Sequence, residues 1–329
     1  MGRERWAFLA ALFSSFGWAS MYPAAKLALA EVEPLHVVWA RAAVAGLALV
    51  LLTAASKRGL RNGLAQLRVE ASTRPGGLLL LGLMNFVATS LLAMSAQRFL
   101  AASVNGLLNN MSPLWLAIVV AFLGRAAHPG RLLVGSLIAL TGVGLVVIGA
   151  DAAASSGPWW QAFATADWRG VGLSLTGSVL IATANIVARR VMPGRNTVAA
   201  TSLASVWAAL VVTPLVFAFA GGFAPLGSVA PGTLLLLLYL GLVSTAFNFT
   251  LWFYALGILP VTQVAPLQYL IPPLGVGLSV IILQEPLTLT LVAGGAAIVA
   301  GIVLAQRGAE PVPAASQAAP PAVAKAKTG

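Results

Sequence analysis

Two sets of amide and aromatic side chains stand at helical spacing inside otherwise apolar stretches. Asn105, Asn109 and Ser112 follow one another at i, i+4 and i+7, so they share one face of a helix. Asn248 and Trp252 repeat the i, i+4 spacing in the second half of the chain. An asparagine that faced lipid would leave up to four hydrogen-bonding positions unmet. We therefore predict that both faces point into a cavity or onto a neighbouring helix.

Other polar and aromatic side chains share this placement. Amides, aromatic faces and backbone carbonyls freed by proline suit an amino acid or a similarly small amphipathic metabolite, whose ammonium group could meet a ring by cation–π contact. The alternative is that such residues hold helices together, each contributing about 0.6 kcal/mol. The predicted substrate-binding residues are Trp18, Ser20, Tyr22, Asn85, Thr89, Asn105, Asn109, Thr183, Asn185, Ser244, Asn248, Trp252, Gln268 and Tyr269. The predicted gating or hinge residues, at which proline removes a helical hydrogen bond, are Pro113, Pro266 and Pro273.

Few residues remain for catalysis. The chain has no cysteine and two histidines, and every Asp and Glu lies at the edge of an apolar stretch or between stretches. A membrane-embedded enzyme would lack its nucleophile, base or metal ligand, so we predict no enzyme, no cofactor and no metal. Lys26 and Arg41 are the only cations deep enough to meet a phosphate, and we expect a substrate of small or zero net charge. Without a deep carboxylate to relay protons, we expect facilitated, gradient-driven transport.

The stretches that carry these residues are long enough to cross a membrane. Of the 329 residues 59% are hydrophobic and 8% are charged, with a mean hydropathy of +0.93, whereas a soluble protein carries about 25% charged residues. Apolar segments of about 20 residues span roughly 30 Å of hydrocarbon as helices, and these segments lack the alternation of barrel strands. They run over 6–26, 34–54, 76–95, 100–122, 131–150, 170–189, 198–220, 231–254, 262–283 and 288–306. The sequence therefore predicts an all-α polytopic membrane protein with ten transmembrane helices.

The positive charge of the chain indicates its orientation. The net charge is +11, but the basic residues lie mainly between the apolar segments. Basic residues that bind nucleic acid would instead form a patch or stripe on one face, so we predict no nucleic-acid partner. If the N-terminus is cytoplasmic, most of the 19 Lys and Arg residues fall in inside segments, which is the bias that orients membrane proteins. We predict a multi-pass protein of the plasma membrane, the bacterial inner membrane, with both termini cytoplasmic.

The two halves of the chain resemble each other. At an offset of 160 residues Pro113 falls on Pro273, and Gly135 falls on Gly295. Five spans per half is an odd number, so the second half would enter the membrane in the opposite orientation, and two such units can open alternately to each side. The predicted units are 1–150 and 170–306, joined by an external loop over 151–169 and followed by a disordered cytoplasmic tail over 307–329. The glycines predicted to let helices approach closely are Gly142, Gly144, Gly294 and Gly295.

Motifs in both halves carry a family resemblance. The first half contains Gly17-Trp18-Ala19-Ser20 with Pro23 and Lys26, followed by Pro34 and Arg41. The second half contains Pro273, Leu283-Gln284-Glu285-Pro286-Leu287, Gly295 and Gly301. Over 6–306 the chain resembles the ten-helix EamA family of the drug/metabolite transporter superfamily, and within it the YddG-type amino-acid exporters. It departs from the family pattern at Gly124-Arg125, where an acidic residue is usual, so we expect no role common to a glutamate in both repeats.

The resemblance implies a transporter built from two EamA-like repeats. Together with the amides and aromatic side chains, it predicts an exporter of amino acids, aromatic ones included, or of similar small metabolites, by alternating access about a central cavity. The alternatives are a carrier of other drugs or metabolites of the same superfamily, and a non-transporting membrane scaffold. The expected partners are a small-molecule substrate and the lipid bilayer, and we expect the protein to function as a monomer.

Overall fold

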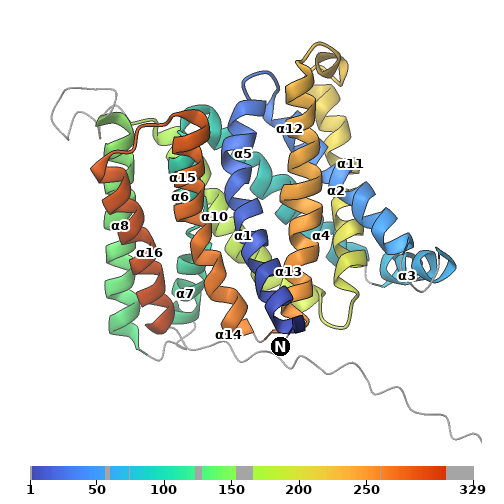
Figure 1. Cartoon of the computed structure of the whole chain (residues 1–329), viewed down its shortest axis with the longest axis horizontal. Coiled ribbons are helices and arrows are strands. Elements are labelled where there is room, and N and C mark those ends of the chain that lie inside the picture. The colour runs from blue at the N-terminus through green and yellow to red at the C-terminus, as the bar shows by residue number, and fades with distance from the viewer. Residues whose placement is uncertain are drawn as a thin grey trace, which may run out of the picture.

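The computed structural model describes residues 2–55, 60–73, 75–122, 128–152, 166–259 and 261–308, and within them the chain is helical with no strand. Figure 1 shows the helices standing side by side in one bundle. We call the edge at which α1 begins the lower edge, and the opposite edge the upper edge. The elements of the first half are α1 (Gly2–Ala28), α2 (Pro34–Ala54), α3 (Leu60–Ser72), α4 (Pro75–Leu81), η1 (Gly82–Ala88), α5 (Thr89–Phe99), α6 (Ala102–Asn109), α7 (Ser112–Phe122) and α8 (Pro129–Ala152). Those of the second half are α10 (Trp168–Val191), α11 (Thr197–Phe219), η2 (Ala224–Gly227), α12 (Pro231–Gly241), η3 (Leu242–Phe247), α13 (Asn248–Leu256), α14 (Val261–Val264), η4 (Ala265–Leu270), α15 (Ile271–Leu283) and α16 (Leu289–Gly308).

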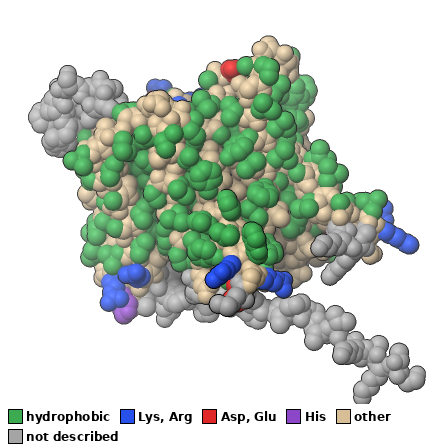
Figure 2. Space-filling view, in the orientation of Figure 1, with side chains coloured by type: hydrophobic (Ala, Val, Ile, Leu, Met, Phe, Trp, Pro, Cys, Tyr) green, Lys and Arg blue, Asp and Glu red, His purple; other side chains and the backbone are tan. Residues whose placement is uncertain are grey.

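The bundle has the surface of a membrane protein. Among the described residues, eight helices are long and apolar enough to cross a bilayer. Large apolar side chains such as Phe13, Phe122 and Leu289 are exposed on its outside. Figure 2 shows hydrophobic side chains over the middle of one face, with more of the visible Lys and Arg side chains along the lower edge than along the upper edge. The chain is therefore a polytopic membrane protein, as its composition predicts.

Helix falls in each of the ten predicted apolar ranges, but two of these ranges are broken. The range 100–122 is not one helix, because α6 ends at Asn109 and α7 begins at Ser112. Pro113 lies in the first turn of α7, where a missing N–H costs no helical hydrogen bond. The range 262–283 is likewise divided, since the 3₁₀ segment η4, which contains Pro266, precedes α15, and Pro273 lies in the first turn of α15. The prolines thus follow the breaks and begin new helices.

Two further irregularities lie in the helices that correspond to each other in the two halves. Both η1 and η3 are π-helical segments, inserted between α4 and α5 and between α12 and α13. Adding 159 to the bounds of η1 gives 241–247, which nearly coincides with η3 at 242–247. Isolated π-helical turns are rare and often mark functional sites, and here they contain Asn85 and Ser244.

Glycines bring α8 and α16 into backbone contact. A Cβ added at Gly142 would lie 2.6 Å from the carbonyl oxygen of Gly294, and one at Gly294 would lie 2.7 Å from that of Gly142. The prediction for these two glycines is confirmed. It is wrong for Gly144, around which an added Cβ would meet nothing within 4 Å, and Gly295 faces the side chain of Leu107 in α6 instead of α8.

The packing of the other helices is reciprocal between the halves. Helix α2 packs on α11, in the same way as α8 packs on α16. Helix α1 packs on α13 and α15 of the second half, and α10 packs on α5, α6 and α7 of the first half. The helices that enclose the middle of the bundle are therefore contributed by both halves.

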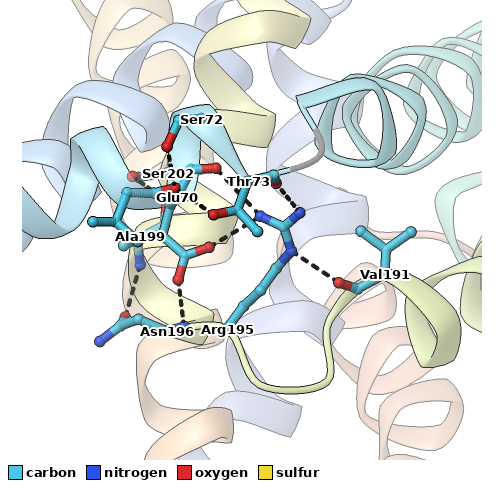
Figure 3. A network of polar contacts seen from close by, with 9 residues as sticks. Glu70, Ser72, Thr73, Val191, Arg195, Asn196, Ala199 and Ser202 are labelled. Carbon is cyan, nitrogen blue, oxygen red and sulfur yellow. Dashed lines mark hydrogen bonds and ion pairs between the residues drawn. The ribbon is translucent and has the colours of Figure 1, made fainter.

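The sequence reasoning missed α3, a short helix at the lower right of Figure 1. Its Leu67 and Glu70 are buried, although most of its other side chains are exposed. Figure 3 shows Glu70 joined to the connection between α10 and α11. The carboxylate of Glu70 accepts hydrogen bonds from Arg195 Nη1 at 3.0 Å and from the backbone N–H of Asn196 at 2.7 Å. This ion pair is almost fully buried and ties α3 to the second half.

Of the predicted linking loop 151–169, residues 153–165 lie outside the described residues, and so does the tail from 309 onward.

Candidate functional site

A hydrogen-bonded group surrounds Tyr22 in α1. Tyr22 is buried and lies six residues, or about 9 Å at 1.5 Å per residue, below the upper end of its helix. Its hydroxyl oxygen accepts hydrogen bonds from Nδ2 of Asn109 at 3.3 Å and from Nδ2 of Asn110 at 2.9 Å. Helix α6 lies against the ring at Gly106, where an added Cβ would make an ordinary van der Waals contact of 3.4 Å with two ring carbons. Because α6 ends here, the helix break positions both amides at the tyrosine.

Arg41 brings a positive charge to the same region from α2. It lies seven residues after the start of α2, or about 10 Å below the upper edge. Its Nε donates to Thr245 Oγ1 of η3, and its Nη1 donates to Ser90 Oγ of α5, each at 3.4 Å. The guanidinium also interacts electrostatically with the hydroxyl of Tyr22. Arg41 therefore contacts helices of both halves, but only through uncharged partners.

Five buried side-chain polar atoms have no hydrogen-bond partner among the described residues, and besides Gln97 Oε1, His36 Nδ1 and Ser136 Oγ there are two on α6 and η3. They are Oδ1 of Asn109 and Oγ of Ser244, on side chains that are 5% and 0% exposed. A buried donor or acceptor left without a partner costs about 1–3 kcal/mol, so such atoms call for an explanation in a native fold.

Asn248 begins α13 directly after the π-helical segment and contacts α1. Its side chain is buried, and its Nδ2 donates to the carbonyl oxygen of Ser244 at 3.4 Å. Its own carbonyl oxygen accepts a hydrogen bond from Ser14 Oγ of α1 at 2.9 Å. Gly17 is required opposite, because an added Cβ would overlap the amide of Asn248. The Gly17 motif thus serves close contact between α1 and α13.

Aromatic rings pack beside Asn248. The ring of Trp18 lies 5.3 Å from that of Trp252 and 5.7 Å from that of Phe249, both edge-on. Phe249 lies in turn 5.8 Å from Phe86 of η1 and 5.8 Å from Phe253. The two predicted tryptophans therefore meet, within an aromatic group that joins α1, η1 and α13.

Asn105 has a different environment from Asn109, although both lie on α6. Asn105 is completely buried, and its Nδ2 donates to the carbonyl oxygen of Ala93 at 3.0 Å. Its Oδ1 accepts a hydrogen bond from Ser174 Oγ at 2.8 Å. These bonds join α6 to α5 and α10, which is the helix-holding role that the sequence left open as the alternative.

Two further predicted hydroxyls have partners within the protein, one in another helix and one in its own helix. Ser20 Oγ shares a hydrogen bond of 2.6 Å with the hydroxyl of Tyr239 and is bonded to the carbonyl oxygen of Gly17 at 2.9 Å. Thr89 Oγ1 donates to the carbonyl oxygen of Asn85 at 2.6 Å. The amide of Asn85 itself is half-buried in η1.

The structure does not bring four predicted residues to this region. Thr183 and Asn185 of α10 are exposed, and the hydroxyl of Thr183 donates to Val179 of its own helix at 3.0 Å. Gln268 is exposed in η4. Tyr269 packs against the apolar core formed by α6, α7, α8 and α16. The repeat offset places these residues at equivalent positions along the chain, but it does not place them at the Tyr22 group.

The deep cation Lys26 is occupied at the upper edge. Its Nζ donates to the carbonyl oxygens of Gln97 and Leu100, the latter at 2.8 Å, where α5 ends. Nearby, the carboxylate of Glu285 accepts hydrogen bonds from the backbone N–H groups of Ala102 at 2.7 Å and Ser103 at 3.0 Å. A carboxylate at a helix N-terminus is favoured by the helix dipole. Glu285 of the second half therefore caps α6 of the first half.

Sequence reasoning set aside Arg41 and Asn110 as site residues. The signal for Arg41 was present, because an ionisable residue inside an apolar helix marks a functional position by default. Asn110 could not be assigned, because its direction depends on the helix break that separates α6 from α7.

A bundle of apolar helices that encloses buried polar side chains defines a polytopic membrane protein. The EamA-like transporter family model matches residues 5–148 and again residues 168–306. The chain belongs to the EamA-like transporter family. It is a multi-pass membrane transporter and not an enzyme.

Two similar proteins extend this assignment. The chain is 28% identical over 293 residues to a "Probable terminal-alkyne amino-acid exporter" of Streptantibioticus cattleyicolor, a match that covers 88% of this chain and 90% of that protein. A solved crystal structure superposes with a TM-score of 0.58 at 21% identity, covering 90% of this chain and 96% of the other. The second likeness concerns the fold alone.

Proposed function

We propose that this protein exports amino acids, or similar small amphipathic metabolites, across the plasma membrane by alternating access. The ten helical ranges form two inverted five-helix units, 1–150 and 170–306, that enclose a central substrate site. Both termini are cytoplasmic, and the protein works as a monomer.

The observation that carries the proposal is the set of unpartnered polar groups between the two halves. Asn109 Oδ1 and Ser244 Oγ are buried without partners, and Arg41 has two long contacts with hydroxyls. A packed membrane protein gains nothing from leaving such groups unmet, whereas a carrier needs them for a substrate that binds and leaves. These groups suit a small ligand that has hydrogen-bond donors and acceptors at one end.

Recurring helix irregularities support the inverted arrangement. The π-helical segments η1 and η3 occupy corresponding positions, and so do the break after α6 and the 3₁₀ segment η4. Transporters of this kind bind substrate near the midplane at interrupted helices in corresponding positions of two repeats. Helices α1 and α10 occupy corresponding positions in the two halves, and each packs against helices of the opposite half. Two related five-helix units that pack against each other would give this arrangement.

The charge distribution supports the orientation. More of the Lys and Arg side chains visible in Figure 2 lie along the lower edge, where α1 begins, than along the upper edge. Positive charge is retained on the cytoplasmic side of membrane proteins, so the lower edge faces the cytoplasm and the upper edge faces outward.

The substrate class follows from the site and from a relative. A curated protein that is 28% identical is named a probable exporter of an amino acid. The amides, the tyrosine hydroxyl and the aromatic group of Trp18 and Trp252 suit a small amphipathic molecule with an ammonium group.

The test is transport by the purified protein in proteoliposomes. We expect counterflow of at least one labelled member of a panel of natural amino acids, and no flux of any member would overturn the substrate claim. Asn109→Ala should raise KM by about tenfold, the equivalent of about 1.4 kcal/mol, because it removes a free acceptor. Asn105→Ala on the same helix is the matched control, and it should lower stability while leaving KM unchanged.

The energy source has its own test. The acidic side chains of the described residues lie at helix ends or outside the apolar ranges, so we propose facilitated movement down the substrate gradient. Flux should follow the substrate gradient and change less than twofold when a proton gradient is imposed across the liposomes. A steep response to that gradient would replace this proposal with proton coupling.

A further inference from the structure

Arg41 is a charged side chain within the apolar helix α2. Arg41 is half-buried and lies about 10 Å below the upper edge, at a rise of 1.5 Å per residue. A charge at such a depth is costly, and it is usually paired or serves a function. The partners of Arg41 therefore decide which of the two applies.

Those partners leave the charge uncompensated. A guanidinium has five N–H donors, and Arg41 donates to two hydroxyl oxygens, those of Thr245 and Ser90, at 3.4 Å each. Both hydroxyls already bond to backbone carbonyls, Thr245 to Leu240 at 2.8 Å and Ser90 to Asn85 at 3.5 Å. Within the described part of the chain, ion pairs form at Glu33 and Glu70, neither of them with Arg41.

Tyr22 provides a second donor beside this charge. Its hydroxyl oxygen receives two hydrogen bonds, from the amides of Asn109 and Asn110, and it interacts electrostatically with the guanidinium of Arg41. Because the oxygen acts as the acceptor in both bonds, its own hydrogen remains to be donated, and no described residue receives it. Arg41 and Tyr22 thus present donors suited to an anionic group.

The complementary acceptor is the amide oxygen of Asn109, which faces Gly177 of α10. Asn109 is held to the tyrosine through Nδ2, which leaves its buried Oδ1 without a partner. A carbonyl oxygen in this state suits a cationic donor such as an ammonium group. The region therefore offers an anion position and a cation position joined by one tyrosine.

We propose that Arg41 and Tyr22 bind the carboxylate of the substrate and that Asn109 Oδ1 binds its ammonium group. This inference rests on the proposed function and narrows its substrate class to zwitterionic α-amino acids. Guanidinium groups bind carboxylates through paired, charge-assisted hydrogen bonds. The substrate carboxylate supplies the counter-charge that Arg41 lacks, so an amine without a carboxylate binds poorly.

The experiment compares three ligands that share one side chain but differ in their charged groups, using the purified protein in proteoliposomes. L-leucine carries both charges, 3-methylbutylamine lacks the carboxylate, and 4-methylpentanoate lacks the ammonium group; L-phenylalanine, 2-phenylethylamine and 3-phenylpropanoate form a second, aromatic set. Each is measured as an inhibitor of counterflow of a labelled amino acid that the wild-type protein transports. The wild type should prefer the amino acid to the amine by at least tenfold in one of the two sets.

Variants of the purified protein then show which residues cause the preference for the amino acid over the amine. Arg41→Met should reduce the preference for the amino acid over the amine to less than threefold, and Arg41→Lys should retain part of it. Tyr22→Phe removes one donor to the carboxylate and also the oxygen that holds Asn109, so it should weaken binding of the amino acid severalfold and reduce its preference over the amine. Arg98→Met, which removes a half-exposed ion pair with Glu33, is the control and should leave the preference unchanged.

The outcomes separate this inference from the proposed function. If the wild type transports amino acids but folded Arg41→Met and Tyr22→Phe keep the full preference over the amine, the carboxylate site is wrong and the exporter stands. If Arg41→Met fails to fold, Tyr22→Phe and Arg41→Lys still decide. If the wild type transports no amino acid, both proposals fall together.

Discussion

Arg195 and Arg41 both lie partly or wholly inside the described structure, and they differ in how completely the fold satisfies their charge. Arg195 pairs with the carboxylate of Glu70 at 3.0 Å and also donates to the backbone carbonyl oxygens of Val191 and Thr73 (Figure 3). Arg41 has two hydroxyl partners at 3.4 Å and no carboxylate among the described residues. The first lies at the lower edge, in the connection between α10 and α11, and the second lies inside the bundle.

The difference separates a structural charge from a charge kept for a ligand. A buried ion pair that is fully hydrogen-bonded fixes one arrangement of its elements, because breaking it leaves an uncompensated charge. A buried charge without a counter-charge does not hold helices together in that way. Arg195 therefore fixes α3 against the second half, while we propose that Arg41 binds a substrate.

The largest effect should come from Arg195→Met. The change leaves the carboxylate of Glu70, whose side chain is 8% exposed, without its counter-charge. We expect a loss of about 3–5 kcal/mol in the free energy of unfolding, measured by thermal unfolding in detergent and by denaturation in mixed micelles.

A double-mutant cycle tests the cause of that loss. Glu70→Gln keeps an acceptor for the N–H of Asn196 but removes the charge, so the pair Glu70→Gln with Arg195→Met should recover part of the stability. Additive losses in the double variant would mean that the two charges do not stabilise each other.

The close contact between α8 and α16 allows the effect of an apolar contact on stability to be compared with that of the Glu70–Arg195 ion pair. Gly142→Ala places a Cβ 2.6 Å from the carbonyl oxygen of Gly294 and should cost about 1–3 kcal/mol through overpacking. Gly144→Ala in the same helix meets nothing within 4 Å, so thermal unfolding of this control should be unchanged or slightly raised. Equal melting temperatures for the two variants would contradict the close approach of the helices.

Glu285 represents an intermediate case between the two arginines. Its carboxylate caps α6 through two backbone N–H groups at the upper edge, but its residue is only half-buried. Glu285→Gln should cost about 1–2 kcal/mol, because a charge-assisted cap becomes a neutral one. Glu33→Gln, which removes a half-exposed ion pair with Arg98, should cost less than about 1 kcal/mol in the same unfolding assay. A loss at Glu285 no larger than that at Glu33 would show that the cap adds nothing.

The helices could be predicted from the sequence because hydropathy and length decide which segments can cross a bilayer. The breaks could not be located in the same way. Pro113 and Pro273 predict interruption, but each lies in the first turn of a new helix, and the interruption itself falls on the residues before it. The π-helical segments carry no proline, so their positions follow from packing and not from local propensity.

The site was predicted in part. Helical spacing placed Asn105 and Asn109 on one face, yet one is fully bonded between helices and the other keeps a free acceptor. That difference arises from Ser174 and Tyr22, which approach from other helices and have no signal in the spacing of α6. Cross-helix partners of this kind require the tertiary structure.

The smallest effect on stability should come from Arg41→Met, the same substitution as at Arg195. Methionine keeps an unbranched apolar stem and removes a charge that has no carboxylate partner among the described residues, so the gain from removing an unpaired charge offsets the loss of two long hydrogen bonds. We expect the free energy of unfolding to change by less than about 1 kcal/mol, measured beside Arg195→Met in the same mixed-micelle assay. If Arg41→Met destabilised the protein as much as Arg195→Met, the hydroxyl contacts of Arg41 would be holding the bundle together, and the distinction between the two arginines would fail.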